Sequence, residues 1–257
     1  MEIVLKTQVG KVVTLTLNRA EKRNALSVAM VNKLKDYFRA LQDDDSVRVI
    51  MLQANGEAFC AGADLEYLQQ LQNNTYEENL ADSQNLAELF QLIYTHTKLI
   101  ISMVEGAALA GGCGLASVCD LSYATPTSKF GYTEVKIGFI PAIVSFFLLR
   151  KIGEAHTKAL LLTGKIIDAQ TAANMGLINE VVAADAIKAH VTNIAEKLCV
   201  ETSPASIALT KNLINEIQPL GLDAAMLLAS QKNAGARATN DCKRGIAAFL
   251  NKEKLTW

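Results

Sequence analysis

The stretch that decides the fold is IISMVEGAALAGGCGLASVCDLSYATPTSKFGYTEVKIGFIP, residues 100–141. It opens with an apolar run that breaks at Gly106, passes through small residues around Gly111 and Gly112, and reaches an isolated carboxylate at Glu134. Glycines leave the backbone open to close approach by a ligand, and a lone acid can carry a proton. The stretch therefore predicts an anion-stabilising site with one acid/base group.

Composition restricts the class of protein. The chain has 257 residues, of which 50% are hydrophobic, enough for a large core. A net charge of -1 argues against general affinity for nucleic acid or anionic membranes, because such binding depends on clustered Lys and Arg. The five cysteines are odd in number and form no CxxC pair, which is typical of reduced thiols. We expect a cytoplasmic protein that binds no membrane, since no leader pattern or long apolar segment is present.

The remaining sequence predicts alternating strands and helices before a helical end. Residues 3–6 and 11–17 read as a hairpin, and 47–52 and 99–104 as buried strands. Ser27 is placed to cap a helix, and Thr75 and Glu78 have the spacing of a capping box. Helices are expected at 143–149, 156–162, 168–175 and 183–198, a strand at 177–182, and an irregular, lid-like segment at 69–74.

Helical periodicity alone remains after Ser203-Pro204, a typical helix start. The predicted organisation is an α/β core over residues 1–200 and a helical region over residues 201–257, with strand-strand-helix units recurring in the core.

Two loops of small residues, Ala61-Gly62-Ala63 and Gly111-Gly112, each follow a predicted strand and precede a helix. If these strands are neighbours, two peptide N–H groups could point at one oxygen and form an oxyanion hole. Removing one such donor typically costs roughly 2.7 to 4 kcal/mol of transition-state stabilisation. The alternative is that the glycines only allow tight turns and close helix packing.

Glu134 has apolar neighbours in FGYTEVKIG, which would raise its pKa and suit it to proton transfer. A surface or structural glutamate is the alternative reading. Other chemistries lack their motifs: Ser117 stands where a dinucleotide fingerprint needs its third glycine, and no GxSxG or HExxH occurs. Cys113 has no histidine partner at motif level. A basic cluster of Arg19, Lys22 and Arg23 is either a phosphate contact or a solvated turn.

Taken together, six blocks resemble the crotonase family, the enoyl-CoA hydratases and isomerases, over nearly the whole chain. They are LNRAEKRNALS (17–27), GEAFCAGADL (56–65), EGAALAGGCGLASVCDL (105–121), FGYTEVKIGFIP (130–141), LLLTGKIIDAQTAANMGLINEVV (160–182) and ARATNDCKRGIAAFLNKEK (236–254). The ordered set is far more specific than any single block.

The resemblance implies a spiral of ββα repeats and a helical C-terminal region that builds homotrimers or dimers of trimers. It implies that the N–H groups of Ala63 and Gly111 hold the oxygen of an acyl-CoA thioester. No metal or redox cofactor is implied, and coenzyme A enters only as part of the substrate. The coenzyme A site is implied at Arg23, Ala25, Leu26, Ala61, Asp64 and Leu65, with Phe249 and Lys252 contributing, often across a subunit boundary.

One departure from the family pattern bears on the reaction. Hydratases that resemble this chain carry two glutamates, but the first of these positions is Gly114 here and only Glu134 remains. One carboxylate can remove and return a proton, so the residues favour isomerisation of 3-enoyl-CoA to 2-enoyl-CoA. The alternatives are an enoyl-CoA or methylglutaconyl-CoA type hydratase, and a non-catalytic acyl-CoA or RNA binding protein on the same fold.

Overall fold

A six-stranded sheet is the largest element of the fold. The computed structural model describes residues 2–257, with every side chain in that range except that of Leu65. The strand order is β1-β2-β3-β5-β7-β10, and all neighbours are parallel except β1 and β2, which form the predicted hairpin. The strands are β1 (Val4–Val9), β2 (Val12–Leu17), β3 (Val49–Ala54), β5 (Leu99–Val104), β7 (Leu121–Ala124) and β10 (Glu180–Val181).

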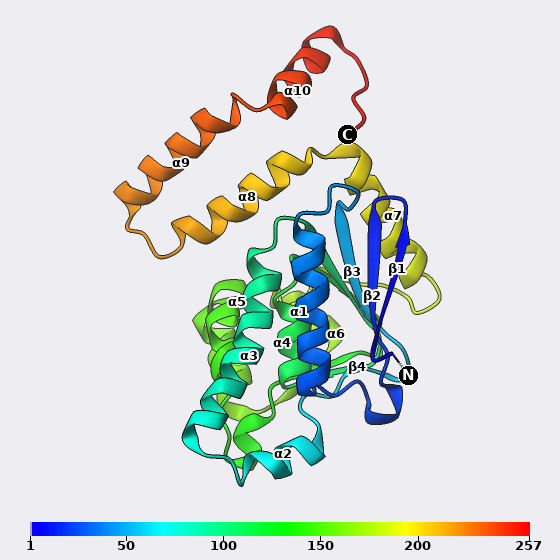
Figure 1. Cartoon of the computed structure of the whole chain (residues 1–257), viewed down its shortest axis with the longest axis vertical. Coiled ribbons are helices and arrows are strands. Elements are labelled where there is room, and N and C mark those ends of the chain that lie inside the picture. Colours follow the sequence, from blue (N-terminus) through cyan, green and yellow to red (C-terminus); the bar gives the residue numbers. More distant parts are fainter. Residues whose placement is uncertain (1) are drawn as a thin grey trace.

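Helices cover both faces of this sheet (Figure 1). Side chains alternate along β3: Ile50 and Leu52 join the core on the side of α1 (Val28–Gln42) and α3 (Tyr76–Thr95), whereas Val49 and Met51 pack with α7 (Ile187–Glu201). Because both faces are buried, these strands read as continuous apolar runs rather than alternating ones.

A second, four-stranded sheet carries the ends of the glycine-rich segments. Its order is β4-β6-β8-β9, with β4 (Ala58–Cys60), β6 (Ala107–Leu109) and β8 (Lys129–Gly131) parallel and β9 (Ile166–Asp168) antiparallel to β8. The pairs β3/β4, β5/β6 and β7/β8 each give one strand to each sheet. A helix follows two of these pairs, α2 (Leu65–Leu71) after β3/β4 and α4 (Gly111–Ser117) after β5/β6.

Helix starts agree with the capping residues read from the sequence. Ser27 Oγ accepts from Met30 N–H at 3.3 Å, and Thr75 and Glu78 form both bonds of a capping box at 3.2 and 2.8 Å. Ser203 likewise caps α8 (Pro204–Ile217), with its oxygen 3.0 Å from Ser206 N. The cap oxygens satisfy donors that have no partner inside the helix.

Two sequence predictions were wrong in detail, the irregular segment at 69–74 and the strand at 177–182. Residues 69–71 end the helix α2 (Leu65–Leu71), which Asp64 caps, and residues 72–74 lie in the turn that follows it. The helices expected at 143–149 and 156–162 are both present, as the two halves of α5 (Ala142–Thr163), which a kink at Gly153 separates because its φ of 71° is not helical. In the first half, Phe146 is 48% exposed. The strand expected at 177–182 shortens to β10 after α6 (Ala169–Asn174).

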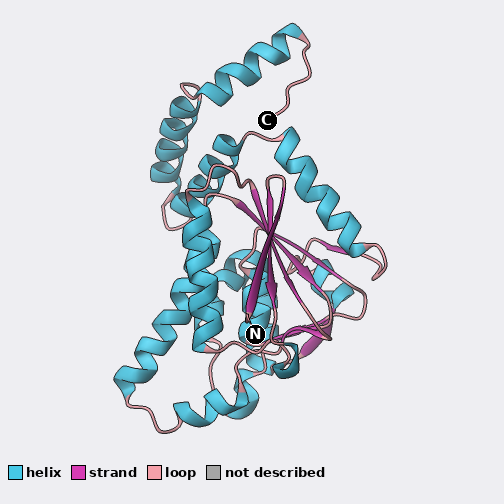
Figure 2. Ribbon diagram, turned by 45° about the vertical axis from the view of Figure 1, so that its right-hand side comes forward, coloured by secondary structure: helices cyan, strands magenta, loops and turns pink. Residues whose placement is uncertain are grey.

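The C-terminal helices extend away from the sheets. Helices α8, α9 (Leu222–Ala236) and α10 (Asn240–Asn251) project beyond the body of the molecule (Figures 1 and 2). Their exposed residues include large apolar ones, among them Leu222, Met226, Leu227, Phe249 and Leu250. The last residue returns to the core, where Trp257 N–H donates to Val200 O at 3.0 Å and Lys11 Nζ donates to Trp257 O at 2.9 Å. No helix within residues 2–257 is long and apolar enough to cross a bilayer.

Replacing Gly106 by alanine tests the link between the sheets. Gly106 joins β5 to β6 with φ of 76°, and an added Cβ would lie 2.0 Å from Glu57 O. Gly10 in the hairpin also has positive φ, at 55°, but an added Cβ there meets nothing within 4 Å. Gly10→Ala should cost about 1 to 2 kcal/mol for the left-handed backbone alone. Gly106→Ala should cost about 1 to 3 kcal/mol more, because the backbone must also move.

Urea unfolding of the two variants measures this difference. Equal free energies of unfolding for Gly106→Ala and Gly10→Ala would show that the contact at Gly106 does not constrain the fold.

Candidate active site

The two glycine loops meet because β4 and β6 are neighbours. Cys60 pairs with Ala108 in this sheet. An added Cβ on Gly62 would lie 2.9 Å from Ala110 Cβ, and one on Gly112 would lie 2.2 Å from Cys60 O. Such approach requires residues without side chains, so the glycines serve close packing and also bring the loops together.

The N–H of Ala63 points away from Leu26, the residue with which Ala63 forms a bridge. Leu26 forms a parallel bridge with Ala63, in which Leu26 N–H donates to Gly62 O at 2.7 Å and Asp64 N–H donates to Leu26 O at 3.4 Å. In this pattern the N–H of Ala63 points to the opposite side, and no acceptor for it is found among residues 2–257. The donor is therefore free for a ligand.

Gly111 supplies a second free donor at the start of α4 (Gly111–Ser117). The first N–H of a helix has no partner within the helix, and none is found elsewhere in the described chain. The preceding Ala110 has φ of 48° and ψ of -125°, rare for a residue with a side chain. Such a conformation costs on the order of 1 to 3 kcal/mol and persists only where the surroundings enforce it, here through Ala110 N–H to Gly131 O at 2.8 Å.

Glu134 begins a short 3-10 turn, η2 (Glu134–Ile137), three residues beyond Gly131. One of its carboxylate oxygens, Oε2, is buried and has no hydrogen-bond partner among the described residues. Burial raises the pKa of Glu134 above its usual value. Because Gly131 O accepts from Ala110 N–H, strand β8, which leads toward this turn, lies beside the residue that precedes α4. A buried, unpaired carboxylate favours proton transfer over a structural role.

Gly114 lies inside α4 and faces apolar side chains of the core. A Cβ there would be 2.5 Å from Val144 Cγ1 and 2.8 Å from Phe90 Cε2, and both of these side chains are buried. The position at which the family pattern expects a further glutamate is thus filled by Val144 and Phe90.

The predicted coenzyme A loop is held in shape from inside. Arg23 and Asn24 both adopt left-handed conformations, with φ of 51° and 52°. The buried Asn24 side chain donates to Asn55 O at 2.7 Å and Ala58 O at 2.8 Å, and accepts from Arg19 N–H at 2.8 Å. Ala61 N–H donates to Arg23 O at 3.0 Å, which joins this loop to the first glycine loop. Sequence reasoning missed Asn24, although asparagine is among the residues that tolerate this conformation.

Asp64 points into the protein rather than toward a ligand. Its carboxylate lies 2.7 Å from Arg19 Nη2 and accepts from Glu66 N–H at 3.0 Å. Burial alone would raise the pKa of Asp64, but the Glu66 N–H and the Arg19 guanidinium together hold it below its usual range. Both charged groups, which the sequence offered as ligand contacts, thus fix the loop. The neighbouring Leu65 side chain lies outside the described ones.

The remaining predicted residues fall into two groups, one beside the glycine loops and one at the far end of the molecule. Ala25 and Leu26 are buried beside the loops, and Leu26 Cδ1 would lie 3.1 Å from a Cβ on Gly111. Phe249 and Lys252 belong to the end of α10, at the opposite end of the molecule from α2 (Figure 1). A single chain therefore does not bring them to the other site residues.

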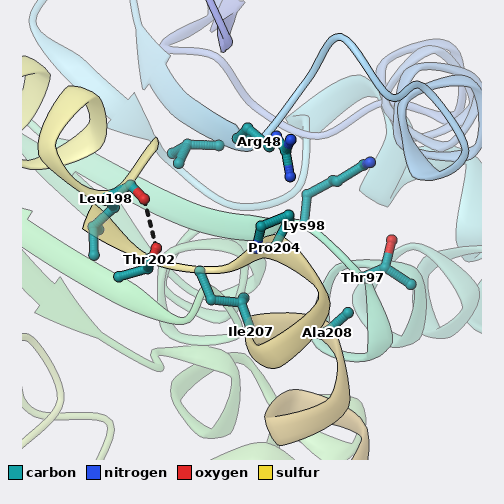
Figure 3. A pocket seen from close by; sticks show the side chains of 9 residues that line it. Arg48, Thr97, Lys98, Leu198, Thr202, Pro204, Ile207 and Ala208 are labelled. Atoms are coloured by element: carbon teal, nitrogen blue, oxygen red, sulfur yellow. Dashed lines mark hydrogen bonds between the residues drawn. The ribbon is translucent and has the colours of Figure 1, made fainter. Parts of the chain in front are cut away.

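One cavity lies beside α2, and a second lies where α7 and α8 join the sheet. One of about 440 Å³ between α1, α2 and α3 is lined mostly by polar side chains, which include Asn32, Tyr67 and Gln70. Another, of about 70 Å³, lies where α7 and α8 join the sheet and contains Arg48 and Lys98 (Figure 3). None of the predicted site residues lines that second cavity.

Comparison with known proteins gives consistent matches over the whole chain. The family model described as enoyl-CoA hydratase/isomerase matches residues 7–257. A Thermus thermophilus protein is 39% identical over 249 residues, covering 97% of this chain and 98% of that protein. A crotonyl-CoA hydratase of Syntrophomonas wolfei is 33% identical and covers 100% of this chain and 98% of its own. The crystal structure of a Mycobacterium smegmatis enoyl-CoA hydratase superposes with a TM-score of 0.94 at 30% identity, covering 100% of this chain and 99% of that one.

Asp64→Asn tests whether the buried pair holds the loop. Asparagine keeps the cap on α2 but leaves Arg19 without its counter-charge, so the variant should lose about 1 to 3 kcal/mol of unfolding free energy at pH 7. The lowered pKa of Asp64 stabilises the native protein above the unfolded-state pKa, and this contribution disappears as pH falls through the folded-state pKa. The difference between wild type and variant should therefore shrink at acidic pH.

Asp168→Asn provides the matched control. Asp168 also caps a helix, α6, but is exposed and has no ion pair among the described residues. Its substitution should change stability less than Asp64→Asn does. An equal loss in both variants, or a difference at Asp64 that is independent of pH, would contradict the assignment.

Proposed function

Because the chain belongs to the enoyl-CoA hydratase/isomerase family, we propose that it acts on acyl-CoA thioesters through an enolate held by Ala63 N–H and Gly111 N–H, with Glu134 carrying the proton. The observations that support this proposal are the buried, unpaired oxygen of Glu134 and two loops whose N–H groups lack acceptors among the described residues. Two preorganised donors stabilise charge that develops on the thioester oxygen, and a carboxylate of raised pKa is matched to abstracting a carbon-bound proton.

The proposed reaction moves a double bond within the acyl chain. Glu134 takes a proton from C2 of a 3-enoyl-CoA, and the electron pair delocalises onto the thioester oxygen as an enolate. The double bond then shifts from C3–C4 to C2–C3 as Glu134 returns the proton to C4. One group serves as base and then as acid, so no second carboxylate is required.

The environment of Gly114 supports isomerisation over hydration. Hydration requires one group to take a proton from water while a proton reaches the α-carbon. Buried Val144 and Phe90 occupy the place where a second acid would lie. Apolar side chains there neither orient water nor transfer protons.

Hydration is the second candidate function, including hydration of methylglutaconyl-type thioesters. It is favoured by the names of relatives, such as the crotonyl-CoA hydratase of Syntrophomonas wolfei. If this chain is a hydratase, a group other than one at position 114 must complete the acid/base pair.

Coenzyme A binding and assembly are part of the same proposal. The loop containing Arg23, Ala25 and Leu26 would line the coenzyme A site with Ala61, while Asp64 acts through Arg19. Phe249, which is 82% exposed, and Lys252 would reach this site from a neighbouring subunit. The exposed apolar residues of α9 and α10 support a trimer or a dimer of trimers, because a face of this kind is usually covered by a partner.

Parallel assays with a 3-enoyl-CoA and a 2-enoyl-CoA test the reaction. We expect wild type to isomerise the 3-enoyl ester, with a rate that rises with pH through the raised pKa of Glu134, because only its carboxylate form is a base. Glu134→Gln should lower kcat by about 10²- to 10⁴-fold and leave the Kd for acyl-CoA little changed. Rapid hydration of the 2-enoyl ester without isomerisation would instead favour the hydratase.

Substitutions at Gly114 test why the second acid is absent. Gly114→Glu should destabilise the protein without raising hydration, because its side chain meets Val144 and Phe90. Gly114→Glu combined with Val144→Gly should recover part of the lost stability, since Phe90 remains 2.8 Å from the added Cβ, and should gain hydration of a 2-enoyl-CoA, with Val144→Gly alone as the control. A gain of hydration in Gly114→Glu by itself would show that Val144 does not block this position.

A further inference from the structure

A cavity of about 210 Å³ lies between α3, α5, α8 and the carboxyl end of α4. Three of its lining residues are cationic, Arg150, Lys151 and Lys211, and one is anionic, Asp120. It lies at the end of α4 opposite Gly111, and none of the residues assigned to acyl-CoA chemistry lines it.

Asp120 is the only carboxylate among the residues that line this cavity, and it is already paired with Lys211. Lys211 Nζ lies 2.6 Å from Asp120 Oδ2 and donates to Lys98 O at 2.8 Å, and Ile100 N–H donates to Asp120 Oδ2 at 2.7 Å. Lys211 is 9% exposed, so this is a buried ion pair whose charges balance each other. The direct ion pair of Asp120 is therefore with Lys211 and not with either of the other two cations.

Lys151 has only neutral partners. Its Nζ donates to Ser117 O at 2.7 Å and Cys119 O at 3.0 Å, at the carboxyl end of α4. An ammonium group has three N–H bonds, so one remains without a partner. No carboxylate in the described part of the chain lies within 4.0 Å of it. Burial lowers the pKa of Lys151, and the nearby charge of Asp120 offsets only part of this effect.

Arg150 adds a second uncompensated cation. Its guanidinium stacks over the Phe146 ring at 3.5 Å, and Nη1 donates to Phe146 O at 3.1 Å. No ion pair links Arg150 to any acid among residues 2–257. Beside it, Gln218 Oε1 accepts from Tyr94 O–H at 3.2 Å, which leaves the Gln218 amide N–H groups free at the cavity rim.

Charge and space together indicate a missing anion. The carboxyl end of α4 offsets part of the Lys151 charge, but a helix end carries only about half an elementary charge. Lys151 is part-buried and Arg150 is exposed, and the hydrogen-bond acceptors of both cations are neutral carbonyl oxygens. The cavity is far larger than the roughly 10 to 15 Å³ that one water molecule needs.

We propose that this cavity binds a small oxyanion, a phosphate or a carboxylate, through Lys151 and Arg150. The anion accepts from the free N–H of Lys151 and from the Arg150 guanidinium, while Lys211 and Asp120 remain paired. Because the cavity touches α3, α4, α5 and α8, occupancy ties the C-terminal helices to the core. The proposal is independent of the reaction at Glu134.

Thermal unfolding of the full-length protein tests the site. The melting temperature is measured in sodium phosphate, sodium acetate and sodium chloride at equal ionic strength. At about ten times its Kd, the bound anion should raise Tm by about 2 to 5 °C relative to chloride. Arg150→Gln and Lys151→Met should each reduce or remove this rise. Lys158→Gln, an exposed lysine on the same helix, should retain it. Whichever of phosphate and acetate gives the larger rise identifies the preferred oxyanion.

Two outcomes would overturn the proposal. One is the absence of any rise in wild type in either phosphate or acetate relative to chloride. The other is a rise that persists in Arg150→Gln, which would place the anion elsewhere; its loss in Arg23→Gln would then assign it to the predicted coenzyme A loop. If Lys151→Met does not fold, Arg150→Gln decides the question, because Arg150 is exposed and its substitution leaves the core intact.

Discussion

The structure depends on the close approach of two backbone segments at the ends of adjacent parallel strands. Gly112 lies so near Cys60 O that a Cβ would be 2.2 Å from it, and Gly62 lies almost as near Ala110. Any side chain at these positions would push the loops apart and separate the two N–H groups they carry. The same glycines are thus required both for packing the second sheet and for forming the site, which is why the structural and functional readings of them cannot be separated.

Around this contact, residues that take no part in the proposed reaction hold the loops that carry the two free N–H groups. The strained Ala110 is fixed by Gly131 O, and the bridge between Leu26 and Ala63 turns the Ala63 N–H outward. The Arg19–Asp64 pair and Asn24 keep the adjoining loop in shape. Preorganisation of this kind matters because donors that are already in place need not reorganise when charge develops on a bound oxygen.

The apolar surroundings determine which chemistry the site favours. Val144 and Phe90 fill the space beside Gly114, so Glu134 is the one acid that we assign to proton transfer. Burial raises the pKa of that acid and leaves one oxygen unpaired, both of which suit reversible transfer of a proton to carbon. The apolar side chains of Val144 and Phe90, together with the Glu134 carboxylate, thus favour the proposed reaction.

The sequence by itself indicated the hairpin, the long strands of the large sheet, most helix starts and the candidate groups, because apolar runs, capping residues and glycines act locally. It missed β7 and the short strands of the second sheet. Ser27, Thr75 and Ser203 cap helices through neighbours three residues away, so their role is legible without the fold. Only the tertiary structure decided that Asp64 faces Arg19, that Val144 fills the space beside Gly114, and that α10 carries Phe249 away from the other site residues. Each of these depends on contacts between residues far apart in the chain, and no local pattern encodes the direction in which a side chain finds its partner.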